Sequence, residues 1–258
     1  MRIRPGMLLA VICCNLLGGS VHAGSAEDAW FKLVGEKFSK RPEFAYVKNN
    51  PALPNVLIYG DSISIHYTER VREKLNGQAN VYRLYCNGGD SSSFIAKMTT
   101  MHDAMREGNL DEPWGFHWDI IQFNVGLHDL KYLSGRKLDK QNGKQVSTIE
   151  GYKKNLGEIV AYLEQLVPDA KLIFATTTPV PPEEPGRVFG DSAKFNAAAR
   201  EVLAGHPEIT INDLYTFTKS HHSDWWIAPD NVHYNKTGSN AQGDEVARVI
   251  LSVLAEKK

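Results

Sequence analysis

Cysteine is scarce in this 258-residue sequence, which contains only three. Two of them, Cys13 and Cys14, lie in an apolar stretch near the start, so removal of that stretch would leave Cys86 alone. A single cysteine cannot form an intrachain disulfide, which excludes the small disulfide-stabilised folds. An excess of charge of one sign is also missing, with 29 basic and 30 acidic side chains. We therefore expect neither a nucleic-acid nor an anionic-membrane partner.

The first 23 residues have the layout of a secretory signal peptide. Two arginines precede an apolar stretch at 7–17, and small residues follow up to Ala23, where we predict cleavage. Asn15 interrupts the apolar stretch, which is shorter than the roughly 20 residues of a membrane span, so an anchor is the weaker interpretation. We expect a secreted or periplasmic protein whose mature chain, residues 24–258, is a single catalytic domain that does not insert into a membrane.

Apolar runs rich in β-branched residues alternate with helical patterns along the rest of the chain. The runs lie at 56–59, 81–85, 120–125, 172–176 and 209–211, and the helical patterns at 63–75, 94–105, 151–166, 193–203 and 237–254. Buried strands separated by amphipathic helices predict a parallel sheet with helices on both faces, and ligands bind such sheets at the carboxyl ends of the strands. Two long polar segments, 131–148 and 179–191, should lie at that edge, either shaping substrate access or as plain surface loops.

Four short blocks follow the predicted strands or precede the last helix. They are Gly60-Asp61-Ser62, Asn87-Gly88-Gly89-Asp90-Ser91, Gly126-Leu127-His128-Asp129 and Asp230-Asn231-Val232-His233. A serine nucleophile needs a base within hydrogen-bond reach and a third group that orients the base. Asp230 and His233 are three residues apart and can meet in one turn. Backbone N–H groups of Ser62 and Gly89 are suitable donors to an oxyanion.

Together the blocks resemble the SGNH hydrolases, also called the GDSL lipase/esterase family, over residues 56–233. The resemblance implies a three-layer α/β/α sandwich with a mostly five-stranded parallel, flavodoxin-like sheet, and hydrolysis of carboxylic esters. It also implies roles for individual residues: Ser62 as nucleophile, His233 as general base, Asp230 as its orienting partner, and Ser62 and Gly89 as oxyanion donors. The third oxyanion donor of the family is ordinarily the asparagine of a Gly-x-Asn-Asp motif. This sequence has His128 at that position.

A histidine can replace that asparagine, because a neutral imidazole donates one N–H and an imidazolium donates two. We expect His128 to donate to the oxyanion, with loss of the third donor or a new substrate contact as alternatives. Asp129 either fixes the tautomer of His128 or caps the loop. Further candidates for substrate contact are Asp61, Asp129, Trp225 and Trp226.

Other motifs give weaker signals. His66, four residues after Ser62, could reach the pocket but is more typical of a helix surface, and His221, His222 and Asp224 lack a recognised metal-ligand spacing. The sequence contains no Gly-x-Ser-x-Gly elbow, phosphate-binding loop or dinucleotide fingerprint. We therefore expect neither a cofactor nor a metal.

The leading hypothesis is an exported serine esterase that removes a small acyl group, such as acetyl, from a carbohydrate. A lipase, lysophospholipase or acyltransferase with the same triad is one alternative, and an inactive carbohydrate-binding protein on the same fold is another. Metal-dependent phosphoester hydrolysis through His128, Asp129 and Asp61 is a third. The sequence gives no indication of the oligomeric state.

Overall fold

A five-stranded parallel sheet forms the centre of the computed structural model, which describes residues 24–256. The predicted signal peptide lies outside the described residues. The strand order is β2-β1-β3-β7-β8, with β1 at Asn55–Tyr59, β2 at Asn80–Arg83, β3 at Ile120–Phe123, β7 at Lys171–Ala175 and β8 at Thr210–Asn212. Each predicted strand is found, and the predicted α/β fold class is confirmed.

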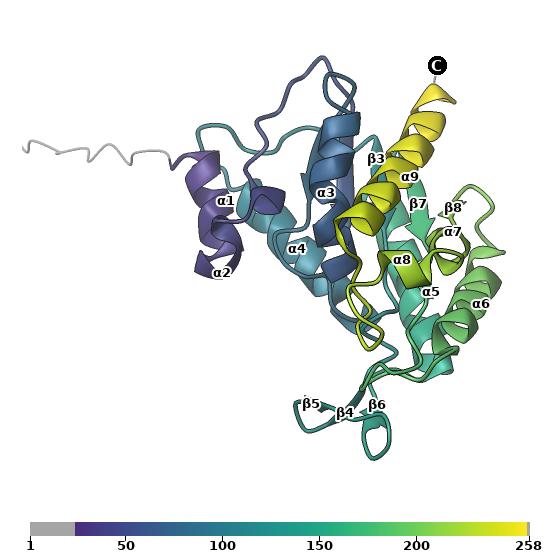
Figure 1. Cartoon of the computed structure of the whole chain (residues 1–258). Coiled ribbons are helices and arrows are strands. Elements are labelled where there is room, and N and C mark those ends of the chain that lie inside the picture. The colour runs from purple at the N-terminus through teal and green to yellow at the C-terminus, as the bar shows by residue number, and fades with distance from the viewer. Residues whose placement is uncertain (1–23, 257–258) are drawn as a thin grey trace, which may run out of the picture.

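Helices cover both faces of the sheet, which gives three layers. On one face α3 (Ser62–Lys74) packs against α9 (Lys236–Ala255), and the other face carries α4 (Phe94–Met105), α5 (Ile149–Leu166) and α6 (Asp191–Leu203) (Figure 1). The remaining short helices are α1 (Ala26–Val34), α2 (Glu36–Ser39), η1 (Pro42–Phe44), η2 (Ser91–Ser93), α7 (Leu214–Lys219) and α8 (His222–Trp225). Of these, α1 packs on α4 and η1 on α3.

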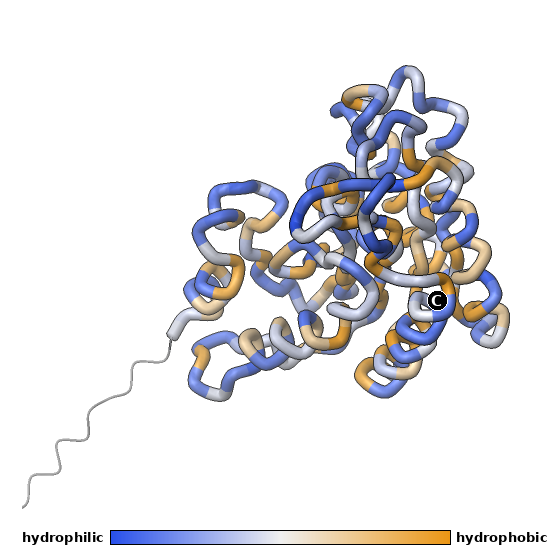
Figure 2. The backbone as a smooth tube through the Cα atoms, turned by 90° about the horizontal axis from the view of Figure 1, so that it is seen from below, coloured by the Kyte–Doolittle hydropathy of each residue, from blue (hydrophilic) through white to orange (hydrophobic). Residues whose placement is uncertain are grey.

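The local sequence explains where the main elements begin. Strand β1 reads NVLIY and is buried at every position, as expected for a strand covered on both faces. Three long helices begin at side-chain caps, in which Asp61, Thr148 and Asn235 accept backbone N–H groups of α3, α5 and α9. Figure 2 shows the resulting distribution, with hydrophobic segments concentrated inside and hydrophilic segments along much of the outer edge.

The two long polar segments meet at the carboxyl edge of the sheet, at the bottom of Figure 1. The first forms a small antiparallel sheet of β4 (Tyr132–Ser134), β5 (Lys137–Leu138) and β6 (Lys144–Gln145). It is joined to the second by backbone hydrogen bonds from Tyr132 N to the Gly186 oxygen (2.7 Å) and from Lys140 N to the Pro185 oxygen (2.9 Å). The two segments therefore form one continuous rim beside the strand ends.

Candidate active site

Ser62 and His233 meet at this edge, although 171 residues separate them in the chain. Ser62 is the first residue of α3, immediately after the end of β1, and His233 lies just before α9. The Oγ atom of Ser62 is 2.8 Å from Nε2 of His233. The loop that holds His233 is fixed by a hydrogen bond from Ile227 N to the His233 oxygen (3.0 Å). The hydroxyl is thus within reach of a base.

The tautomer of His233 follows from its contact with Asn231. Oδ1 of Asn231 lies 2.7 Å from Nδ1 of His233 and also accepts the backbone N–H of His233, at 2.9 Å. A backbone N–H only donates, so the amide atom at this position must be the oxygen. Nδ1 of His233 therefore carries the hydrogen, and Nε2 is free to accept the Ser62 hydroxyl proton.

Asp230 does not occupy the position expected from the sequence. Its side chain is exposed and forms no hydrogen bond or ion pair with any residue of 24–256, and Asn231 holds Nδ1 of His233 instead. The loop backbone turns the side chain of the next residue toward the imidazole. Sequence spacing indicated that this segment would supply the orienting group, but it could not distinguish two adjacent side chains in an irregular loop.

A second histidine lies beside His233. The ring of His66 is centred 5.4 Å from that of His233, at an interplanar angle of 49°. Burial, together with the charges of His66, Arg187 and Lys131, lowers the pKa of His233 below its ordinary 6.5. His233 is therefore neutral and able to accept a proton at neutral pH. The sequence signal for His66 was its position one helical turn after Ser62, which is also compatible with an exposed side chain.

Two consecutive glycines bring the second block against the first. Gly88 N donates to the Gly60 oxygen at 2.9 Å, and a Cβ atom on Gly88 would lie 2.8 Å from that oxygen, so only glycine permits this approach. The backbone N–H of Gly89, an expected oxyanion donor, is hydrogen-bonded to Oδ1 of Asn87 at 2.9 Å. The N–H of Ser62 lies in the first turn of α3, where no earlier helical carbonyl is available to accept it.

His128 contacts a lysine rather than Asp129. Its Nδ1 is 2.9 Å from Nζ of Lys131, and burial followed by the charges of Lys131 and Arg187 lowers the pKa of His128 to about 3. The imidazole is therefore neutral at any pH at which the protein is expected to work. Nε2 of His128 forms no hydrogen bond with another residue of the described chain.

Asp129 is fully buried, which is inconsistent with direct substrate contact. Its carboxylate accepts the backbone N–H of Ser91 (3.0 and 3.2 Å), the hydroxyl of Ser91 (2.6 Å) and the hydroxyl of Ser147 (2.6 Å). These bonds hold the turn after β3 against Ser91 of η2 and against Ser147, which lies just before α5. Of the two roles expected for Asp129, loop fixation is the one that this geometry supports.

Asp61, Trp225 and Trp226 are also candidates for substrate contact from the sequence, but their surroundings do not support that role. Asp61 is 1% exposed and caps α3 by accepting Ile63 N at 2.8 Å, and burial raises its pKa. Trp225 stacks on His221 with ring centroids 4.0 Å apart, and Trp226 stacks on His222 at 3.8 Å. Both tryptophans are half-buried and pack against the core, so they hold α8 in place.

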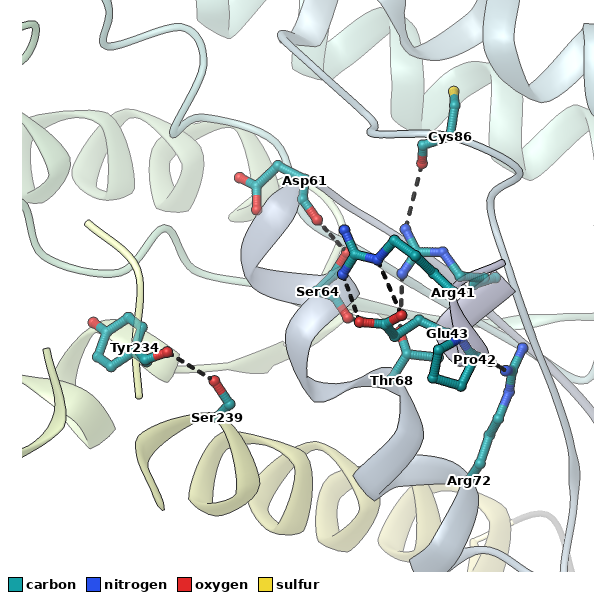
Figure 3. A network of polar contacts seen from close by, with 11 residues as sticks. Arg41, Pro42, Glu43, Asp61, Ser64, Thr68, Arg72, Cys86, Tyr234 and Ser239 are labelled. Atoms are coloured by element: carbon teal, nitrogen blue, oxygen red, sulfur yellow. Dashed lines mark hydrogen bonds and ion pairs between the residues drawn. The ribbon is translucent and has the colours of Figure 1, made fainter. Parts of the chain in front are cut away.

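A buried arginine connects α3, which begins at Ser62, to the glycine loop, the segment 84–89 that carries Gly89. Arg83, at the end of β2, is completely buried; it donates to Oγ1 of Thr68 on α3 (3.0 Å) and to the backbone oxygen of Cys86 (3.3 Å). Its guanidinium lies 4.5 Å from the centroid of the Phe44 ring. Figure 3 shows Thr68 and Cys86 on the two sides of this network. The arginine therefore fixes α3 relative to the glycine loop.

The GDSL-like Lipase/Acylhydrolase family model matches residues 58–241, which include all four blocks. The chain belongs to this family. It is a serine-dependent carboxylic ester hydrolase, as the sequence resemblance predicted. No curated protein sequence matches the chain at a significant level.

Solved esterases have a similar fold. An acetyl xylan esterase superposes with a TM-score of 0.58 at 16% identity, over 76% of this chain and 99% of that one. A lipase/acylhydrolase from Enterococcus faecalis gives 0.56 at 17% identity, over 76% and 95% of the two chains. A catalytic mutant of an acetylxylan esterase from Geobacillus stearothermophilus gives 0.56 at 15% identity, over 76% and 93%. These similarities show that the hydrolase has the fold of this family.

Metal-ligating residue types come together away from the serine. Within residues 24–256, the ligand atoms of Glu164, His206 and Glu208 lie within 4.8 Å of one another. They lie near the end of α5 and before β8, at the opposite edge of the sheet from Ser62. His221 and His222 each stack on a tryptophan instead.

No helix in the described part of the hydrolase is long and apolar enough to cross a membrane.

Proposed function

We propose that this hydrolase is an exported serine esterase that removes a small acyl group, such as acetyl, from a carbohydrate. The observation that carries the proposal is the 2.8 Å contact between Ser62 Oγ and the unprotonated Nε2 of His233. Residues 1–23 would direct export, and residues 24–258 would form one catalytic domain. No cofactor or metal takes part in the proposed reaction.

The reaction has two halves. Ser62 Oγ attacks the ester carbonyl as its proton passes to Nε2 of His233, and Asn231 holds the imidazole through Nδ1. The oxyanion receives hydrogen bonds from Ser62 N–H and His128, and from Gly89 N–H once Asn87 releases it. His233 then protonates the leaving alcohol. A water molecule gives a proton to Nε2 of His233 as it attacks the acyl-Ser62 ester. His233 then passes that proton to Ser62 Oγ as the bond between Oγ and the acyl carbon breaks, which releases the acid and restores the Ser62 hydroxyl and the neutral imidazole.

Two observations, together with the proposed export, support a carbohydrate ester as the substrate. Two structures with a similar fold are described as acetylxylan esterases. The rim beside the strand ends consists largely of polar segments, 131–148 and 179–191. Export would bring the enzyme into contact with extracellular or cell-wall polysaccharides. A lipase or acyltransferase would use the same serine and histidine, so the substrate must be identified by assay.

Hydrolysis of a panel of esters tests the proposal. The panel contains acetylated xylan, other acetylated polysaccharides, and p-nitrophenyl esters of increasing acyl length. We expect release of acetate from a polysaccharide, a preference for short acyl chains, and no effect of a chelator. Ser62→Ala should lower kcat by about 10⁴-fold or more. Equal turnover by this variant would refute the serine mechanism, and a preference for long acyl chains would favour a lipase.

A further inference from the structure

The contact between His128 and Lys131 decides which ring nitrogen of His128 carries the hydrogen. A lysine ammonium has three N–H donors and no acceptor, so Nδ1 of His128, 2.9 Å away, must be the acceptor. The hydrogen of the neutral ring is therefore on Nε2. In a histidine the hydrogen bond at one nitrogen sets the protonation of the other. Lys131 thus makes Nε2 a donor.

The turn that carries both residues is rigidly held. Leu130 N donates to the Gly126 oxygen (3.0 Å) and Lys131 N to the His128 oxygen (3.3 Å), which places the two side chains one turn apart on the same side. Buried Asp129, between them, anchors the turn through the serine contacts described above. The residue that follows β6 also holds the turn, because Val146 N donates to the Lys131 oxygen at 2.8 Å.

The donor at Nε2 matters because another donor of the site is already engaged. Gly89 N–H is hydrogen-bonded to Asn87, which leaves Ser62 N–H and His128 as the donors not bound to another residue of the described chain. The opposite tautomer of His128 would present a lone pair from Nε2 and would repel an oxyanion. A neutral imidazole in an asparagine's place therefore works only if its tautomer is fixed.

We propose that Lys131 is a positioning residue that locks His128 in the Nε2–H tautomer and so makes it a hydrogen-bond donor to the oxyanion. This inference rests on the proposed ester hydrolysis at Ser62. An asparagine needs no such partner, because its amide nitrogen donates without a tautomeric choice. Lys131 therefore supplies what a histidine needs at this position and an asparagine does not, a partner that fixes the tautomer.

Burial and the charged groups around the pair keep it in the required protonation state. The charged groups that act on His128 and Lys131 are Arg187, Lys97, Asp90, Asp61 and Glu184. Burial, followed by the nearby positive charges, lowers the pKa of His128 to about 3, so it does not become an imidazolium at working pH. Burial lowers the pKa of Lys131, while Asp61, Glu184 and Asp90 oppose that change. If Lys131 lost its proton at alkaline pH, the tautomer of His128 would no longer be fixed.

A double-mutant cycle tests the inference through kcat. Lys131→Met removes the donor with little change in side-chain length, and Lys154→Met, at an exposed position of α5 outside both rim segments, is the matched control. We expect Lys131→Met to lower kcat by about 10- to 100-fold with little change in KM, less than the about 10²- to 10³-fold loss on deleting an oxyanion donor. Lys131→Arg should recover much of the rate, and Lys154→Met should match wild type.

The decisive comparison uses His128→Asn as the background. An amide donor needs no lock, so adding Lys131→Met to His128→Asn should change kcat less than about threefold, given the tautomer argument. A fall of equal size in both backgrounds would overturn the inference, because it would mean that the lysine charge acts directly on the reaction.

A second measurement does not depend on turnover. In enzyme labelled with ¹⁵N-histidine, the wild-type spectrum at neutral pH should show His128 with protonated Nε2 and unprotonated Nδ1, and Lys131→Met should show a mixture. A protonated Nδ1 in wild type would overturn the lock even if the esterase is active. Activity that survives in Ser62→Ala would instead overturn the proposed serine chemistry and leave the tautomer assignment standing.

Discussion

At the scale of single residues, the site uses two imidazoles in opposite tautomers. His233 carries its hydrogen on Nδ1, facing Asn231, whereas His128 carries it on Nε2 because Lys131 donates to Nδ1. In the proposed reaction one ring accepts a proton from Ser62 and the other donates to substrate oxygen. The sequence led to the same two roles for these histidines, and both stay predictions. It could not predict the partners Asn231 and Lys131, since side-chain directions in irregular loops depend on backbone geometry that no periodicity encodes.

The amide partner of His233 leads to a prediction about pH. Catalysis needs neutral His233, so activity falls as the pH drops through its pKa, which burial and neighbouring cations hold below 6.5. Asn231→Asp places a negative charge beside Nδ1 and stabilises the imidazolium. We expect the acid limb of kcat/KM to move up by about one pH unit or more, measured from pH 4 to 9 with a neutral ester.

Asp230→Asn is the matched control for this change. The Asp230 side chain is exposed and makes no contact with His233 in the described structure, so the acid limb should shift by less than about 0.3 unit, as for a screened surface charge. A large shift in Asp230→Asn with none in Asn231→Asp would assign the orienting role to Asp230.

At the scale of elements, the predicted strands and long helices are present because they have strong periodicity. The elements that sequence reasoning missed are short or polar. Strands β4, β5 and β6 contain only two or three residues each and show no apolar alternation. The N-terminal helices α1 and α2 precede the first apolar strand, and their packing on α4 and η1 is set by tertiary contacts. Local pattern cannot specify such contacts.

Arg83 is the clearest link between elements, and its removal should have a measurable cost. Arg83→Met would leave the buried oxygens of Leu84, Cys86 and Thr68 without their donor, although it also relieves burial of a charge. We expect the free energy of unfolding to fall by roughly 2–4 kcal/mol. Urea unfolding at pH 7 measures this change.

Arg248→Met provides the comparison for a surface arginine. Arg248 is paired with Glu245 and lies on the solvent-exposed side of α9, and its loss should change the free energy of unfolding by less than about 0.5 kcal/mol. If the two variants were equally stable, the buried network would not hold α3 against the glycine loop.

At the scale of the whole molecule, neutral histidines in the interior couple stability to pH. His102 on α4 is 6% exposed, and its Nε2 accepts the indole N–H of Trp118 at 3.1 Å. Burial lowers the pKa of His102 from 6.5 to about 4. The unfolded chain therefore binds a proton that the folded chain does not. Stability from this residue is present above pH 6.5 and is lost as the pH falls toward 4.

The variant His102→Gln should remove this part of the pH dependence. Gln has an oxygen that can accept the Trp118 N–H, and it does not titrate. Between pH 7 and 5, wild type should lose about 2 kcal/mol more free energy of unfolding than the variant does. Urea titrations of both proteins at the two pH values measure the difference. An identical loss in both would mean that His102 is already charged in the fold.

The joined rim segments also constrain how this enzyme can change its specificity. Two stretches far apart in the chain share backbone hydrogen bonds, from Tyr132 to Gly186 and from Lys140 to Pro185. Lengthening or shortening one stretch alone would break pairing with the other and disturb the turn that carries His128. A new substrate preference that needs a larger rim would therefore require compensating changes in both stretches. Libraries that vary 131–148 and 179–191 together should yield more folded, active enzymes than libraries that vary either one alone.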